Sequence, residues 1–166
     1  ELHMAPEKPY VSSKLVRQWQ IGKCEGAVAD DESGRIYISE ETKGVWELSG
    51  NPSGVTPGQL VIRVGENDLP GDLEGMALLK RPDGDRWLFL SCQGLNSYRV
   101  YSCKQNHRLI GEFRIEGAQL TDGIDLTASS LGPVFPQGVF GCHTDLEPRP
   151  ILLTPLNDIL SQLPQK

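Results

Sequence analysis

The chain has 166 residues, of which 38% are hydrophobic and 23% charged, and no run is apolar enough to span a membrane. This composition is typical of a single globular domain. The formal net charge of -6 and the lack of a basic stripe argue against nucleic acid as a partner. Carboxylates that converged on one site would instead suit hard cations such as calcium.

The first 13 residues are expected to be a leader ahead of the domain. They begin with a segment that contains a His-Met pair and lacks the apolar core of a signal peptide, so we expect no signal peptide in this chain. Residues 14–21 are predicted to form an extra strand at the front of the domain. The domain itself is expected to cover residues 14–154.

An internal repeat of about fifty residues runs through this domain. An acidic residue followed by glycine opens a short apolar run three times, at Glu25, Glu74 and Asp122. In each unit a second strand ends in polar residues, and a third carries β-branched and aromatic residues between turn formers. A fourth, outer strand follows in the first two units. Four short antiparallel strands per fifty residues are typical of a β-propeller blade.

The predicted fold is therefore all-β, a β-propeller fragment of about three four-stranded blades. We expect the blades at residues 25–64, 73–115 and 122–154, and the third lacks a sequence for its outer strand. Residues 155–166 are predicted to be a short amphipathic helix or tail, because apolar residues recur there at helical spacing: Leu156, Ile159, Leu160 and Leu163.

The acidic-glycine positions should converge on one end of the propeller. Innermost strands line the central channel, so equivalent side chains of successive blades point toward the same axis. Asp72 should share the strand face of Glu74 if side chains alternate. Such carboxylates raise one another's pKa values unless a cation compensates them. The alternative is that each carboxylate accepts backbone hydrogen bonds at a turn; three carboxylates in register favour a shared cation site.

The ends of the second strands add further candidates. Either Glu40 or Glu41 is a plausible oxygen ligand, and Gln93 is a neutral one at the equivalent position. His143, at the same end of the third blade, is expected to be a hydrogen-bonded structural residue. His107 lies in a polar turn and is expected to be exposed, and residues 30–34 are expected to form an ordinary turn.

The four cysteines form no Cys-x-x-Cys pair of the metal-binding type. A turn centred on Gly94 and Leu95 would pair Cys92 with Ser97 and bring Cys103 close to Arg86. That register keeps Cys92 and Cys103 apart. Buried thiols and a disulfide among the other pairs both remain possible.

Several segments together resemble the C-terminal half of the β-propeller phytases. They occur in the family's order from Cys24 to Phe140: CEGAVADDESGRIYISEE, DLEGMALL, SCQGLNSYRVY, GEFRI, TDGIDL and LGPVFPQGVF. The resemblance implies a six-bladed propeller that binds calcium ions and hydrolyses phosphate monoesters of phytate, which is a 3-phytase activity. It also implies a secreted or periplasmic protein.

The resemblance further implies roles for individual residues. Catalytic roles fall on Glu25, Glu41 and Glu74, which would hold the catalytic calcium cluster, and substrate-binding roles on Gln93 and Asp122. The implied calcium ligands are Glu25, Glu41, Asp72, Glu74, Gln93 and Asp122. Bound metal ions lower the pKa of water and neutralise phosphoryl oxygens, so this chemistry needs no nucleophilic side chain.

Two departures from the family pattern limit these expectations. The acidic insertion that precedes the Thr121–Gly123 segment in the family is shortened here to EGAQL, and the family's N-terminal half, with its phosphate-binding basic and tyrosine residues, has no counterpart. A non-catalytic half-propeller therefore remains an alternative. It would bind calcium, or assemble as a homodimer or with the missing half to complete six blades. A related propeller that acts on another phosphate ester or a lactone is a third possibility.

Overall fold

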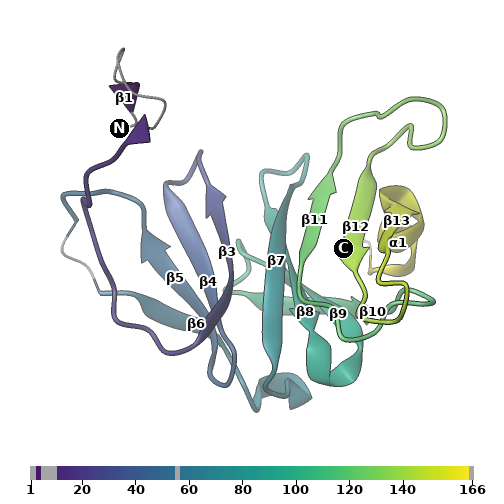
Figure 1. Cartoon of the computed structure of the whole chain (residues 1–166), viewed down its shortest axis with the longest axis horizontal. Helices are drawn as coiled ribbons and strands as arrows, with labels where there is room; N and C mark the ends of the chain where they lie inside the picture. Colours follow the sequence, from purple (N-terminus) through teal and green to yellow (C-terminus); the bar gives the residue numbers. More distant parts are fainter. Residues whose placement is uncertain (1–2, 5–10, 55–56, 165–166) are drawn as a thin grey trace.

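The computed structural model describes residues 3–4, 11–54 and 57–164. In this part of the chain, three antiparallel sheets of three or four strands lie side by side (Figure 1). The first sheet consists of β3 (Cys24–Asp30), β4 (Arg35–Glu40), β5 (Gly44–Ser49) and β6 (Gln59–Arg63). The second consists of β7 (Leu73–Lys80), β8 (Arg86–Cys92), β9 (Ser97–Ser102) and β10 (Arg108–Phe113). The third consists of β11 (Ile124–Thr127), β12 (Val139–His143) and β13 (Ile151–Pro155).

Within each sheet the strands follow chain order, so each sheet is a meander that corresponds to one predicted blade. The all-β prediction is confirmed, and so is the absence of an outer strand from the third sheet among the described residues. The remaining elements are the short pair β1 (His3–Met4) and β2 (Val11–Ser12), two 3-10 turns, η1 (Glu66–Asp68) and η2 (Gln93–Leu95), and helix α1 (Leu156–Gln162).

Two hydrophobic cores fill the spaces between neighbouring sheets. Strand β8 shows why: side chains alternate across a strand, so Leu88 and Leu90 join the core beside the first sheet, while Trp87 and Phe89 join the core beside the third. The middle sheet is therefore buried on both faces. Helix α1 covers the outer end of the core beside the third sheet with buried Leu156 and Ile159, and Leu163, the residue after the helix, is buried in the same core. The predicted short amphipathic helix is therefore confirmed.

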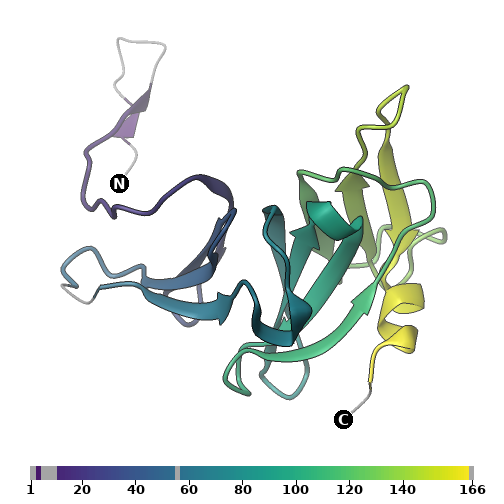
Figure 2. The ribbon, with the colours of Figure 1, turned by 90° about the horizontal axis from the view of Figure 1, so that it is seen from below.

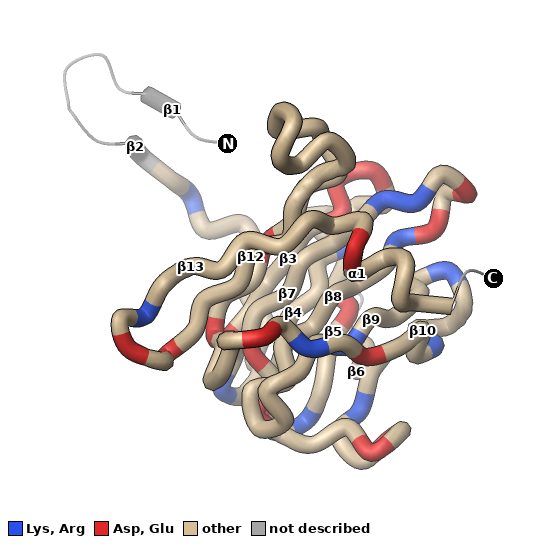
Figure 3. The backbone as a smooth tube through the Cα atoms, turned by 90° about the vertical axis from the view of Figure 1, so that its right-hand side faces the viewer, with Lys and Arg blue, Asp and Glu red and all other residues tan. Residues whose placement is uncertain are grey.

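Charged groups also join the first two sheets. Residues 30–34 were predicted to form an ordinary turn, and a turn does follow β3. Asp30 at its start is nevertheless buried, and its Oδ1 lies 3.3 Å from Nε of Arg86 on β8. Nη2 of Arg86 lies 2.6 Å from Glu32 Oε2, and Lys80 pairs with the same carboxylate. Elsewhere acidic and basic positions are interspersed along the backbone (Figure 3). No helix within the described residues has the length and apolarity needed to span a bilayer.

Residues 14–21 do not form the predicted strand. They lie beside the first sheet without a ladder of backbone hydrogen bonds. Nη1 of Arg17 instead donates to the carbonyls of Ser49 and Asn51, at 3.0 and 2.8 Å. The Arg17 side chain thus makes the contacts that a strand would make with its backbone. The pattern of apolar and polar residues alone does not distinguish these two arrangements.

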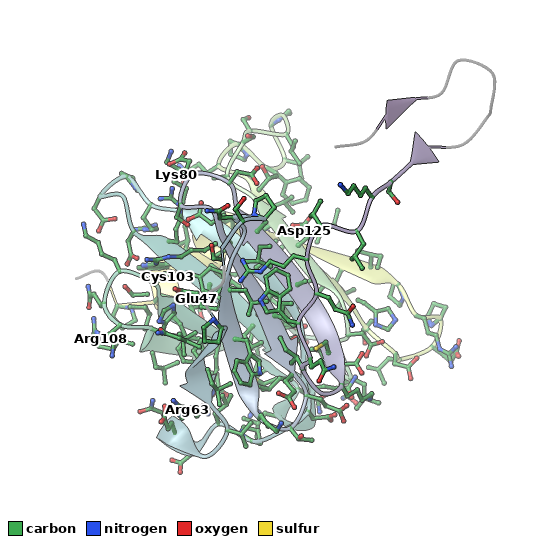
Figure 4. The ribbon with its side chains drawn as sticks, turned by 90° about the vertical axis from the view of Figure 1, so that its left-hand side faces the viewer. Glu47, Arg63, Lys80, Cys103, Arg108 and Asp125 are labelled. Atoms are coloured by element: carbon green, nitrogen blue, oxygen red, sulfur yellow. The ribbon has the colours of Figure 1, made fainter. Side chains whose placement is uncertain are left out.

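His107 is not the exposed turn residue that its surroundings predicted. Its side chain is only 9% exposed, and its ring meets that of Tyr37 edge-on, with centroids 5.8 Å apart. Asn106 and His107 both have positive φ, which turns the imidazole back against the first sheet. There it approaches Glu47, which lies close to Cys103 in Figure 4. Burial lowers the pKa of His107.

The cysteines follow the predicted register. Cys92 pairs with Ser97, and the backbone N–H of Cys103 donates to the carbonyl of Arg86, so Cys92 and Cys103 lie apart as expected. Each of the four cysteines is a free thiol in the described structure.

Candidate functional site

The three acidic-glycine motifs lie at one end of the molecule. Strands β3, β7 and β11 lie side by side, and all three begin at the lower edge in Figure 1, the end that faces the viewer in Figure 2. Glu25 and Glu74 are the second residues of β3 and β7, and Asp122 stands just before β11. The predicted convergence of the repeat positions is therefore present in the fold.

Glycine follows Glu25 and Glu74 because the next sheet comes very close to both positions. A Cβ atom on Gly26 would lie 2.6 Å from the carbonyl oxygen of Glu74, and one on Gly75 would lie 2.5 Å from that of Asp122. Both distances are far below van der Waals contact, so only glycine fits. The N–H of Gly75 also donates to the Asp122 carbonyl, at 2.7 Å.

Two serines at equivalent positions add hydrogen bonds between neighbouring sheets. Ser39 on β4 donates to the carbonyl of Glu74, at 2.7 Å, and Ser91 on β8 donates to that of Thr121, at 2.8 Å. In β3 and β7 the register shifts at the acidic residue, between Cys24 and Gly26 and between Leu73 and Met76. Such bulges turn backbone groups away from the ladder of their own sheet. In β7 the Glu74 carbonyl is thereby free to contact the first sheet, which fixes the spacing between successive carboxylates.

Glu74 is the most buried of these carboxylates, with 6% of its surface exposed. Burial, together with the charges of Glu25, Asp122 and Asp72, raises the pKa of Glu74 to about 7, while Lys23 opposes the shift. These groups are thus close enough to interact electrostatically. Their carboxylates form one acidic cluster.

Glu25 and Glu41 share one ammonium group. Nζ of Lys23 lies 2.8 Å from Glu25 Oε1 and 2.6 Å from Glu41 Oε2. Glu41 Oε2 is buried, and its contact among the described residues is this ion pair. The backbone of Glu41 is held on both sides, because its N–H donates to the Lys23 carbonyl and its own carbonyl accepts from Leu73 of the second sheet.

The structure also separates Glu40 from Glu41, which sequence alone left open. Glu40 is 3% exposed and accepts a hydrogen bond from Trp46 Nε1 at 2.8 Å, and its other oxygen lies 2.8 Å from Nζ of Lys43. Its carboxylate is therefore satisfied within the first sheet. Glu41 is the residue of the pair that joins the acidic cluster, through the lysine that it shares with Glu25.

Asp122 is surrounded by polar side chains of the second and third sheets. Nε2 of Gln93 donates to Asp122 Oδ1 at 2.6 Å, and Nδ1 of His143 lies 3.6 Å from Asp122 Oδ2. His143 was expected to be hydrogen-bonded, but its buried Nδ1 has no hydrogen-bond partner among the described residues. Gln93 and Asp122, to which the resemblance assigns substrate-binding roles, are thus neighbours.

Asp72 lies near Glu74, but not because side chains alternate along a strand. It precedes β7 and has a φ of 67°, and the bulge after Leu73 breaks the period of two, so the argument that placed it beside Glu74 was wrong. Its carbonyl accepts from the N–H of Gln93 at 3.0 Å. Asp72 still acts on the pKa of Glu74, so it lies near the cluster.

The donor set suits a hard cation, although the described residues hold no preformed ligand triad. Five carboxylates and one amide supply oxygen atoms, the ligands that calcium prefers, and Glu41 Oε2 is buried without a hydrogen bond. Within the described residues, however, no three Asp, Glu, His or Cys side chains converge as a metal site. Lys23 instead contacts Glu25 and Glu41, and Gln93 contacts Asp122. A cation would replace these contacts by side-chain rotation.

Comparison with known proteins identifies the family. The family model described as phytase matches residues 3–147. The chain belongs to the phytase family. The 3-phytase of Bacillus subtilis (strain 168) is 39% identical to it over 140 residues, which cover 80% of this chain and 37% of that protein. The phytase-family chain thus spans little more than a third of the length of the relative it matches.

Sequence reasoning missed Lys23 as part of this site. Lysine beside an acidic residue is unremarkable in a sequence, because most such pairs are solvated. The signal that could have indicated it is its position: it precedes the first acidic-glycine motif by one residue, at the end where the carboxylates converge.

Proposed function

We propose that this chain forms the metal-binding part of a calcium-dependent phytase, which hydrolyses phosphate monoesters of phytate or another inositol phosphate. The observation that carries the proposal is the clustering of Glu25, Asp72 and Asp122 around Glu74, whose pKa is raised to about 7. A cluster with this excess of negative charge favours bound cations. Membership of the phytase family supplies the substrate class.

The proposed ligands are the six residues predicted from the resemblance: Glu25, Glu41, Asp72, Glu74, Gln93 and Asp122. Calcium bound there would neutralise phosphoryl charge and lower the pKa of a coordinated water. Glu25, Glu41 and Glu74 would hold the cation beside the reacting phosphate. Gln93 and Asp122, which already contact each other, would orient the substrate at the edge of the cluster.

Phosphate release from phytate tests this function, measured with calcium and after its removal by EDTA. We expect chelation to abolish release and Glu74→Ala to lower it about a hundredfold or more, because a ligand of the cluster is lost. Asp31→Ala is the control, since Asp31 is an exposed acidic residue in the turn after β3. Release that survives EDTA, or that is unaffected by Glu74→Ala, would refute the proposal.

A second candidate is a partial propeller that must assemble before it acts. The motivating observation is the outer face of the third sheet, which the strand register assigns to Asp125, Gly141, His143, Ile151 and Leu153. We call it the open face. Ile151 and Leu153 are 64% and 58% exposed there. The corresponding faces of the first two sheets are covered by the next sheet.

The open face has residues equivalent to those that contact the next sheet in the first two repeats, but no sheet among the described residues covers them. His143 lies opposite Gly123, as Ser39 lies opposite Gly26, and no heavy atom of the described residues lies within 4 Å of a Cβ built on Gly123. We propose that further blades cover this face in the active protein. A homodimer of two three-blade units, or the missing half of a longer chain, would supply them. The molecular mass in solution distinguishes the two.

A further inference from the structure

Lys23 occupies the place of a cation in the acidic cluster. Its Nζ lies between the carboxylates of Glu25 and Glu41, at 2.8 and 2.6 Å, and these contacts raise the pKa of Lys23. The two carboxylates are 27% and 20% exposed, whereas the lysine side chain is 70% exposed. The ammonium therefore reaches the pair from the solvent side, on a flexible stem.

The contacts of Lys23 are electrostatic and readily exchanged. An ion pair with an exposed lysine contributes little stability, because water screens it and the side chain loses freedom. The same charge nevertheless opposes the rise in the pKa of buried Glu74, so it acts on a carboxylate beyond the two that it contacts. Lys43 offers a contrast in the same sheet, since it pairs with Glu40, whose other oxygen binds Trp46 outside the cluster.

We propose that Lys23 is an exchangeable counter-ion of this site. It offsets one of the two negative charges of Glu25 and Glu41 while they hold no metal, and it is displaced when both carboxylates bind a divalent cation. The released ammonium then stands at the rim of the cluster, where it contacts a phosphate of the bound substrate. The inference rests on the proposed function and adds a basic, phosphate-binding residue to a site otherwise made of oxygen donors.

Displacement predicts that Lys23 competes with calcium. We expect Lys23→Met to raise calcium affinity about threefold to tenfold at low salt, and Lys23→Arg to leave it near that of the wild type, since a cation is retained. Isothermal titration of the metal-free 166-residue chain with calcium alone measures both. Lys43→Met is the matched control, because it removes the same charge from a neighbouring pair, and we expect it to change the affinity less than twofold.

The second half of the proposal is tested with a polyanion that cannot be hydrolysed. In saturating calcium, myo-inositol hexasulfate should bind Lys23→Met at least about threefold more weakly than Lys43→Met, because one contact to the anion is lost. Lys23→Gln repeats both titrations with a polar side chain, and circular dichroism verifies that each variant is folded. Affinities of Lys23→Met equal to those of Lys43→Met in either titration would overturn the corresponding role of Lys23.

The outcomes also separate this inference from the proposed function. If the wild type binds calcium and Lys23→Met binds it no better, only the inference fails. If Lys23→Met binds calcium more tightly but the protein releases no phosphate from phytate, the inference stands and the phytase assignment fails. If neither protein binds calcium, both are wrong.

Discussion

Burial and like charge make Glu74 the residue whose protonation should control the stability of the metal-free chain. Its pKa is raised to about 7 in the folded state from the ordinary value of 4.5, so the folded protein holds this proton more tightly than the unfolded chain does. The stabilisation that results is complete below about pH 4.5 and is lost as the pH rises toward 7.

Glu74→Gln should therefore stabilise the chain in EDTA at pH 8, by about 1–3 kcal/mol, because the variant avoids a buried charge. Near pH 4.5 the two proteins should be equally stable. Urea unfolding at both pH values measures the difference. With calcium the order should reverse at pH 8, since the wild type gains a ligand that the variant lacks. A variant that is less stable than the wild type in EDTA at pH 8 would contradict the assigned pKa.

At the scale of the elements, the junction between innermost strands depends on glycine. A Cβ on Gly75 would meet backbone atoms of the third sheet, Asp122 O at 2.5 Å and Ile124 N at 2.9 Å, and backbone cannot move aside as a flexible side chain can. We expect Gly75→Ala to destabilise the chain by about 1–3 kcal/mol or more, as measured by thermal or urea unfolding.

Gly123→Ala is the matched control for this prediction. It changes the equivalent glycine of the third repeat, where no described atom lies within 4 Å of the added methyl group. Its effect on the isolated chain should be smaller than about 1 kcal/mol and can be stabilising, because alanine restricts the unfolded chain. Equal losses at both positions would show that sheet contact is not the reason for the repeated glycine.

The sequence repeat predicted the sheets well because the repeated residues are those that pack the sheets against one another. Blades expected at residues 25–64 and 73–115 are the sheets from Cys24 to Arg63 and from Leu73 to Phe113, and the third sheet also lacks its outer strand. The errors arose where backbone geometry departs from simple alternation. Asp72 has positive φ before a bulge, His107 follows another residue of positive φ, and residues 14–21 replace a strand ladder by side-chain contacts.

The candidate site was predictable only in part, for a related reason. Repetition places Glu25, Glu74 and Asp122 at one end of the sheets, and this needs no knowledge of side-chain orientation. The choice between Glu40 and Glu41 depends on which of the two carboxylates contacts Trp46 and Lys43. The role of Lys23 depends on which carboxylates its flexible side chain reaches. These contacts cannot be derived from spacing.

For the whole molecule, the open face decides how the chain exists in solution. An exposed leucine gains about 1.5–3 kcal/mol when it is buried, and the open face contains Leu153 and Ile151 side by side with small or polar neighbours. Strand β3 of the first sheet has the same bulged acidic-glycine motif with which β7 contacts the first sheet. One copy could therefore cover the open face of another, and two such contacts would close a ring.

We expect sedimentation at micromolar concentration to show a dimer, and Leu153→Asp to shift it toward monomer, because a charge would be buried in the contact. Leu131→Asp is the control: Leu131 is 56% exposed, against 58% for Leu153, but it lies outside the open face, in the segment between β11 and β12. A wild-type chain that remains a compact, stable monomer would rule out the second copy. The open face would then belong to blades of a longer protein, since the chain covers only 37% of its relative from Bacillus subtilis.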